Sequence, residues 1–171
     1  MLTAIIFDWG DTVMRNFPGA SGPMAFWPRV EAVAGVAAAV EALSRSYVLA
    51  IGSNAGESDA DLVRAALERV DLAHYFDHIF TSRDLGCAKP KEEFFRAVLK
   101  ALDCRPDEAV MVGDSYEIDI LGAHAAGLRT VWYNPYGRRL RDSVADREIR
   151  RMADLERVIA ELEAAALGER L

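Results

Sequence analysis

The segment AIIFDWGDT, residues 4–12, joins an apolar run to a cluster of polar residues. The run Ala4–Phe7 is typical of a strand buried on both faces, because it is continuously apolar rather than alternating. Asp8 follows directly, so a carboxylate stands at the end of this strand. Open α/β sheets place their chemistry at the carboxyl ends of the strands. The segment therefore predicts both a fold class and the position of a site.

The rest of the chain repeats the pattern of short strand and amphipathic helix. Strands are predicted at 3–7, 47–51, 78–81, 109–112 and 129–133, and apolar residues at helical spacing indicate helices at 33–43, 62–70, 94–99, 118–126 and 153–167. Ser58 with Asp61 indicates a capping box for the second helix. Regular alternation predicts a three-layer, Rossmann-like α/β fold, a parallel sheet with helices on both faces. Right-handed crossovers bring the loops after the strands to one edge.

Length and charge limit the possible functions. With 171 residues, 51% of them hydrophobic, the chain can bury a full core, and we expect one domain over residues 1–171. The net charge of −7 argues against a nucleic-acid partner, because phosphate backbones are bound by clustered Lys and Arg. The one basic stretch, 138–151, holds six Arg among three acidic residues. We interpret it as a solvated loop and helix face, with a phosphate-attracting rim as the alternative.

The sequence contains no signal for a membrane, a disulfide framework or a zinc site. No segment approaches the apolar length of a membrane span, and the N-terminus has no charged leader followed by an apolar stretch, so we expect a cytoplasmic protein without a membrane partner. Cys87 and Cys104 have no Cys or His at metal-ligand spacing. The apolar stripe of the last helix fits packing on the sheet or a dimer contact, which leaves the oligomeric state open.

Residues 14–28 interrupt the α/β pattern. The stretch FPGASGP, 17–23, is incompatible with regular structure, whereas Met24, Phe26 and Trp27 are apolar. We expect a loop over the edge of the sheet, which acts as a minimal cap. It leaves directly from the strand that carries Asp8, so its aromatic residues are candidates for ligand contact as well as for packing. The remaining chain has no room for a sizeable cap domain.

Chemistry-bearing residues follow three further strands. The sequence places Gly52-Ser53-Asn54 after the second strand, Lys89-Pro90 after the third, and Gly113-Asp114-Ser115 after the fourth, with Asp119 five residues beyond Asp114. Each motif alone has an ordinary explanation, as a turn, a solvated charge or a helix cap. Together with the Asp8 segment, and in this order, they resemble the four motifs of the haloacid dehalogenase (HAD) superfamily over residues 3–135.

The resemblance implies an Mg²⁺-dependent phosphatase. Asp8 would attack a phosphoryl group and form an aspartyl-phosphate, which water then hydrolyses. Mg²⁺ prefers oxygen ligands, and the resemblance assigns it the carboxylates of Asp8 and Asp114 and the backbone carbonyl of Gly10. The substrate would be a phosphorylated small molecule or a bulkier phosphorylated molecule, since the absence of a large cap leaves the site open.

The remaining motif residues have supporting roles in this interpretation. Lys89 would neutralise the nucleophile and the transferred phosphoryl group, while Ser53 and Asn54 would bind phosphoryl oxygens. Asp119 would fix Lys89 or a metal-bound water rather than ligate the metal, and Ser115 would open the helix that carries it.

Gly10 is where the sequence departs from the family pattern. The family has a second aspartate at this position, which protonates the leaving oxygen and later activates water, a contribution of about 10²–10⁴-fold. Three explanations are open. Asp11, one residue later, replaces the acid; the substrate has a good leaving group, such as an acyl or aryl phosphate; or the protein is a catalytically impaired module that binds phosphate or protein.

Two other HAD activities lack the second aspartate. Dehalogenases have a Tyr there, and phosphonate-cleaving enzymes have the similar motif Asp-Trp-Ala-Gly-Thr. Both kinds use residues of a sizeable cap domain, for which this chain has no room. The sequence therefore favours a phosphatase over both.

Overall fold

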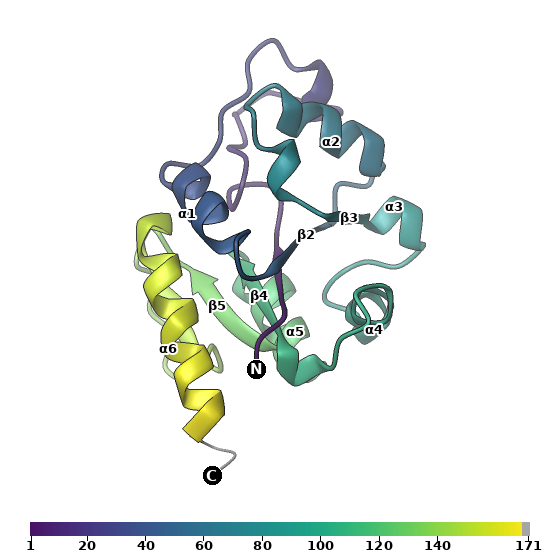
Figure 1. Ribbon diagram of the computed structural model, residues 1–171. Helices are drawn as coiled ribbons and strands as arrows, with labels where there is room; N and C mark the ends of the chain where they lie inside the picture. Colours follow the sequence, from purple (N-terminus) through teal and green to yellow (C-terminus); the bar gives the residue numbers. More distant parts are fainter. Residues whose placement is uncertain (169–171) are drawn as a thin grey trace.

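A single parallel sheet lies at the centre of the computed structural model, which describes residues 1–168 (Figure 1). Its strands are β1 (Ala4–Phe7), β2 (Val48–Ser53), β3 (His78–Thr81), β4 (Ala109–Gly113), β5 (Arg129–Tyr133) and β6 (Arg147–Ile149). Their order is β3-β2-β1-β4-β5-β6, and each neighbouring pair is parallel. The chain order thus reverses at β1, which lies between β2 and β4. Ligands of open α/β sheets bind at such a switch point.

The helices are α1 (Val36–Leu43), α2 (Ala60–Glu68), α3 (Ser82–Leu85), α4 (Glu92–Ala101), α5 (Leu121–Ala125) and α6 (Leu155–Gly168). A π-helical turn, Tyr116–Ile120, leads into α5, so the helix predicted at 118–126 is divided in two. Short 3-10 turns cover Met24–Phe26, Ala73–Tyr75, Pro106–Glu108 and Met152–Asp154. Within residues 1–168, no helix has both the length and the apolar character needed to cross a membrane.

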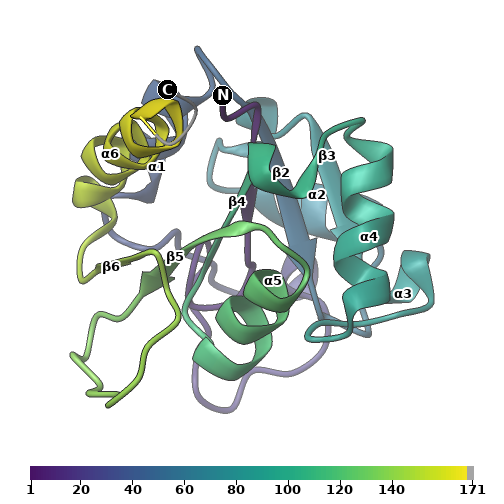
Figure 2. The same ribbon diagram turned by 90° about the horizontal axis from the view of Figure 1, so that it is seen from below.

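The side chains of β1 alternate between two cores. Ile5 and Phe7 pack in the core formed with α1, α2 and α6, whereas Ile6 packs in the core formed with α4 and α5. Figure 2 shows α1 and α6 on one side of the sheet and α4 and α5 on the other. All four residues of β1 are buried, as a strand covered on both faces requires. The predicted three-layer α/β fold is confirmed.

Two details of the strand prediction are wrong. Gly52 and Ser53 belong to β2 rather than to the loop after it, so Ser53 is the last residue of a buried strand. The basic stretch 138–151, interpreted as loop and helix face, contains the edge strand β6, which pairs with β5. Three residues with two charges carry too weak a pattern to be recognised as a strand.

The predicted capping box is also wrong. The N-cap of α2 is Asp59, whose Oδ1 accepts a hydrogen bond of 3.0 Å from Leu62 N, rather than Ser58. Ser58 is buried and lies one residue before the cap. Asp and Ser are comparable N-cap residues, and the two alternatives lie side by side in the sequence, so the sequence did not separate them.

Candidate active site

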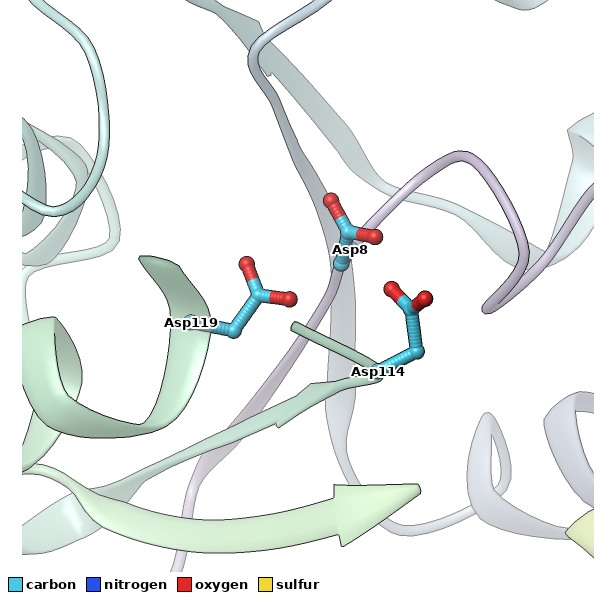
Figure 3. Close-up of side chains that lie close together, drawn as sticks. All are labelled: Asp8, Asp114 and Asp119. Carbon is cyan, nitrogen blue, oxygen red and sulfur yellow. The ribbon is translucent and has the colours of Figure 1, made fainter. Parts of the chain in front are cut away.

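Three carboxylates converge at the switch point of the sheet (Figure 3). Asp8 follows β1, Asp114 follows β4, and Asp119 lies in the π-helical turn. One oxygen of each lies within 4.8 Å of the others. The parallel neighbours β1 and β4 end in register, with Phe7 beside Val112, and this register brings the first two carboxylates together.

Lys89 links two of these carboxylates. Its Nζ lies 2.7 Å from Asp8 Oδ1 and 2.7 Å from Asp119 Oδ1, and its side chain is fully buried. Burial lowers the pKa of Lys89, but the two carboxylates outweigh this effect, so its pKa is raised and the ammonium stays charged. Burial and the charge of Asp8 raise the pKa of Asp119, against the lowering effect of Lys89.

The Thr12 hydroxyl lies between Asp8 and Asp114. Its Oγ1 is 3.1 Å from Asp8 Oδ2 and 3.3 Å from Asp114 Oδ1, and it accepts a hydrogen bond of 3.2 Å from Asp114 N. A hydroxyl has one hydrogen, so it can donate to only one of the two carboxylates at a time. Thr12 belongs to the first motif, but no role was predicted for it. Its place in that motif, four residues after Asp8, was the available signal.

The main chain around Gly113 fixes Asp119. Asp119 Oδ2 accepts a hydrogen bond of 3.1 Å from Ser115 N, and Ser115 Oγ accepts one of 3.4 Å from Ile118 N, which caps the turn. An ideal Cβ at Gly113 would lie 2.3 Å from Asp119 Oδ2. Any other residue at this position would therefore displace the carboxylate from Lys89.

Asn54, expected to bind phosphoryl oxygens, also has a role in positioning Lys89. Its Nδ2 donates to Lys89 O at 2.8 Å, and its Oδ1 accepts from Lys89 N at 2.9 Å. Both ends of the amide are thus bound to the main chain of Lys89, so the side chain positions Lys89, and its second Nδ2 hydrogen remains for a ligand in the cavity that Asn54 lines. Ser53 Oγ accepts a hydrogen bond of 2.9 Å from Ala55 N, which leaves the hydroxyl hydrogen for a ligand.

Asp11, the candidate substitute for the missing acid, is held by Asn16. Its backbone has a φ of 57°, in the left-handed region, and its carboxylate accepts two hydrogen bonds of 2.9 Å from Asn16, one from N and one from Nδ2. Asp8 and Asn16 line one cavity, whereas Asp11 lines a different one. The interpretation of Asp11 as a substitute acid is therefore not supported by the geometry. Asn16, for which no role was predicted from the sequence, lies beside Gly10 instead.

A cavity of about 370 Å³ lies over Asp8, Lys89 and Asp119. Its other walls come from the segment after β2 and from the loop 14–28, which contributes Asn16, Gly22, Met24 and Trp27. Two side chains hold this loop in place. Arg69 donates hydrogen bonds to the carbonyls of Met24, Ala25 and Trp27, and the indole of Trp27 donates to those of Ser21 and Gly22. The loop thus forms one wall of the cavity.

The donor set fits a divalent cation. Three carboxylates share one ammonium, so the cluster has an excess of negative charge. Burial and the charge of Asp8 raise the pKa of Asp114 from 3.8 to about 6. Both oxygens of Asp119 are engaged, by Lys89 and Ser115. Asp8 and Asp114 share the Thr12 hydroxyl, and their carboxylates face each other (Figure 3). Hard oxygen ligands of this kind suit Mg²⁺.

The raised pKa of Asp114 makes a prediction for stability. In the metal-free protein, the free energy of unfolding should fall as the pH rises from about 4 to about 6, because the folded state binds this proton more tightly than the unfolded chain does. Mg²⁺ competes with the proton and should reduce the fall. Urea denaturation across this pH range, with EDTA and with Mg²⁺, measures both effects. If the free energy of unfolding of Asp114→Asn falls by the same amount over this pH range, the effect does not come from Asp114.

Comparisons with known proteins agree with this geometry. The sequence pattern of the haloacid dehalogenase-like hydrolase family matches residues 24–133, more than half of the chain. The match includes Ser53, Lys89, Asp114 and Asp119, and Asp8 precedes it. The chain therefore belongs to the haloacid dehalogenase-like hydrolase family, as the resemblance of its motifs predicted.

Two curated relatives have named activities. The phosphoserine phosphatase of Thermus thermophilus is 38% identical over 118 residues, which cover 69% of this chain and 45% of that protein. The ribulose-1,5-bisphosphate 5-phosphatase of Halopiger xanaduensis is 49% identical over 71 residues, which cover 42% of this chain and 30% of that protein. The chain thus spans less than half the length of these two relatives.

A solved structure matches over nearly its full length. An uncharacterized protein from Listeria monocytogenes serotype 4b is 28% identical, with a TM-score of 0.83. The match covers 95% of this chain and 99% of that one. The Listeria protein therefore has the same arrangement of elements with almost no residues outside the match.

Proposed function

We propose that this protein is a Mg²⁺-dependent phosphatase that forms an aspartyl-phosphate on Asp8. The observation that carries the proposal is the position of Asp8. Its carboxylate lies at the switch point of the sheet, 2.7 Å from the buried ammonium of Lys89, beside Asp114, and in the wall of a cavity. The names of the two curated relatives, both phosphatases, support the same class of reaction.

Each group around Asp8 has a task in this reaction. An oxygen of Asp8 attacks the phosphorus, and Lys89 offsets the repulsion between this carboxylate and the anionic phosphoryl group. The Ser53 hydroxyl, at the end of β2, donates to a phosphoryl oxygen. Asp119 binds the ammonium of Lys89, and Asn54 binds its main chain, so Lys89 is held at both ends. Mg²⁺ held by Asp8 and Asp114, with the Gly10 carbonyl as the further ligand, would supply charge stabilisation for the transferred group.

The cavity suits a phosphorylated small molecule. Its volume of about 370 Å³ is at the lower end of the usual range for ligand pockets. We further propose that residues 1–171 act as one domain, with the loop 14–28 as a minimal cap. A cytoplasmic location, without nucleic-acid or membrane partners, completes this proposal.

A catalytically impaired binding module is the second candidate. Gly10 supplies no acid, and the Asp11 carboxylate is bound by Asn16. A protein with this site could bind a phosphate group and a cation without turnover. This candidate shares the ligands of the first and differs from it in the absence of a covalent intermediate.

Phosphate release separates the two candidates. We expect Mg²⁺-dependent release of phosphate from acyl and aryl phosphates, and loss of this release with EDTA. Intact-protein mass spectrometry after incubation with acetyl phosphate and Mg²⁺ should detect a phosphate adduct, because breakdown of the aspartyl-phosphate also lacks its usual base. Absence of both release and adduct, with Mg²⁺ binding demonstrated, would favour the binding module.

A further inference from the structure

The carboxamide of Asn16 fills the space beside Gly10. An ideal Cβ built on Gly10 would lie 2.6 Å from Asn16 Nδ2, closer than Cβ atoms approach other atoms in real structures, and 3.2 Å from Asn16 Cγ, a tight contact. Gly10 and Asn16 both line the cavity that contains Asp8. A side chain at position 10 would therefore require the amide of Asn16 to move from its place in this wall. The amide stands where a side chain at position 10 would begin.

Asp11 determines which way this amide faces. Its Oδ1 accepts a hydrogen bond from Asn16 N and its Oδ2 accepts one from Asn16 Nδ2, each at 2.9 Å. An ionised carboxylate only accepts hydrogen bonds, so the NH₂ end of the amide must face Asp11. One of its two hydrogens is donated to Asp11, and the second remains for another acceptor. The left-handed backbone of Asp11, with φ of 57°, gives its carboxylate this direction.

We propose that the wall formed by Gly10 and Asn16, which supplies no acid, restricts the enzyme to phosphates with weakly basic leaving groups, acyl phosphates above all, and that Asp11 is the positioning residue of the Asn16 amide. This inference rests on the proposed function, since it concerns the leaving group in the attack by Asp8. An amide N–H can donate a hydrogen bond to the leaving oxygen, but it cannot transfer a proton to it. The leaving group must therefore depart as an anion.

The bond changes balance without an acid. An Asp8 oxygen forms a bond to phosphorus, the bond from phosphorus to the leaving oxygen breaks, and its electron pair leaves as a carboxylate anion when the substrate is an acyl phosphate. Water then attacks phosphorus, the bond to Asp8 breaks, and both water hydrogens leave with the phosphate product, directly or through solvent. The three kinds of substrate differ in the basicity of the anion that leaves. The pKa of the conjugate acid is about 4 for a carboxylate and about 10 for a phenolate, and it is far higher for an alkoxide, near that of bulk water.

The test replaces the amide by a carboxyl group at position 10. We compare wild type, Asn16→Ala and the double variant Gly10→Asp/Asn16→Ala on acetyl phosphate, phenyl phosphate and ethyl phosphate. Wild type should show a steep fall in kcat/KM along this series. The double variant should raise kcat/KM for ethyl phosphate by about 10²–10⁴-fold, the contribution of a general acid. Asn16→Ala removes the amide without adding an acid, so its kcat/KM should still fall steeply from acetyl phosphate to ethyl phosphate.

The outcomes separate this inference from the proposed function. Comparable wild-type turnover of ethyl and acetyl phosphate would overturn the inference and leave the phosphatase standing. The same holds if the folded double variant gains nothing on ethyl phosphate, with folding checked by circular dichroism. If the double variant does not fold, the comparison of wild-type kcat/KM on acetyl and ethyl phosphate still tests the inference. Absence of Mg²⁺-dependent release from every substrate in every variant would overturn the proposed function itself.

Discussion

Asp8→Asn should abolish phosphate release, with a loss in kcat of about 10⁴–10⁶-fold, the range seen when an enzyme loses a residue of its nucleophilic machinery. The amide has the size of the carboxylate but not its charge or nucleophilicity, so no covalent intermediate can form. The measurement is phosphate release from acetyl phosphate with Mg²⁺, together with mass spectrometry of the intact protein. The phosphate adduct expected for wild type should be missing.

The same substitution should leave the fold in place. The amide oxygen introduced at position 8 could still accept the hydrogen bond from Lys89, whose Nζ lies 2.7 Å from the Asp8 carboxylate in wild type. Loss of the Asp8 charge also removes a neighbour that raises the pKa of Asp114, so that pKa should fall. A lower pKa of Asp114 in the folded variant is therefore a second readout, independent of activity.

A matched control makes the same chemical change at an exposed aspartate. Asp61→Asn lies in the first turn of α2, outside the cavity that contains Asp8, and should leave phosphate release unchanged. Residual release by Asp8→Asn at a tenth of the wild-type rate or more would rule out Asp8 as the nucleophile. The reaction would then have to use another nucleophile, such as water.

The sequence predicts the residues at the switch point well, because each follows a recognisable apolar strand. Asp8 and Asp114 come directly after β1 and β4, and a parallel sheet aligns the carboxyl ends of its strands. Lys89 lies in a loop, but the resemblance to the HAD motifs identified it. The layers of the sheet were predictable for the same reason, since continuous apolar runs indicate strands covered on both faces.

The contacts around Gly10 could not be predicted in the same way. They depend on a left-handed backbone at Asp11 and on a hydrogen bond to Asn16, five residues away in an irregular loop. No hydrophobic period describes such a loop. Asn54 was likewise assigned to substrate alone, because the sequence does not show that its amide pairs with the main chain of Lys89, 35 residues later.

Lys89→Met should destabilise the protein as well as inactivate it. The side chain of Lys89 is fully buried and lies 2.7 Å from Asp119 Oδ1, and the Asp119 side chain is only 1% exposed. Methionine fills a similar volume but leaves Asp119 buried with one hydrogen bond, from Ser115 N, and with no ammonium to offset its charge when it ionises. Breaking a buried ion pair in this way costs about 3–5 kcal/mol of unfolding free energy. Urea denaturation with EDTA measures it.

The pH dependence gives the loss a recognisable sign. Without the ammonium, the pKa of Asp119 rises further above that of the unfolded chain, because Lys89 no longer lowers it. The stability that this group supplies is complete below the unfolded pKa and is lost as the pH rises through the folded one. The deficit of Lys89→Met relative to wild type should therefore be larger at pH 8 than at pH 5. An equal deficit at both values would contradict the ion pair as its cause.

A second substitution separates the structural role of Lys89 from its role in catalysis. In Lys89→Met/Asp119→Asn, the isosteric amide still accepts from Ser115 N but carries no charge, so part of the lost unfolding free energy should return. Phosphate release should not return, because no ammonium remains beside Asp8 to offset its repulsion of the phosphoryl group. Recovery of both together would mean that Lys89 acts only through the fold, and recovery of stability alone assigns the ammonium to the reaction.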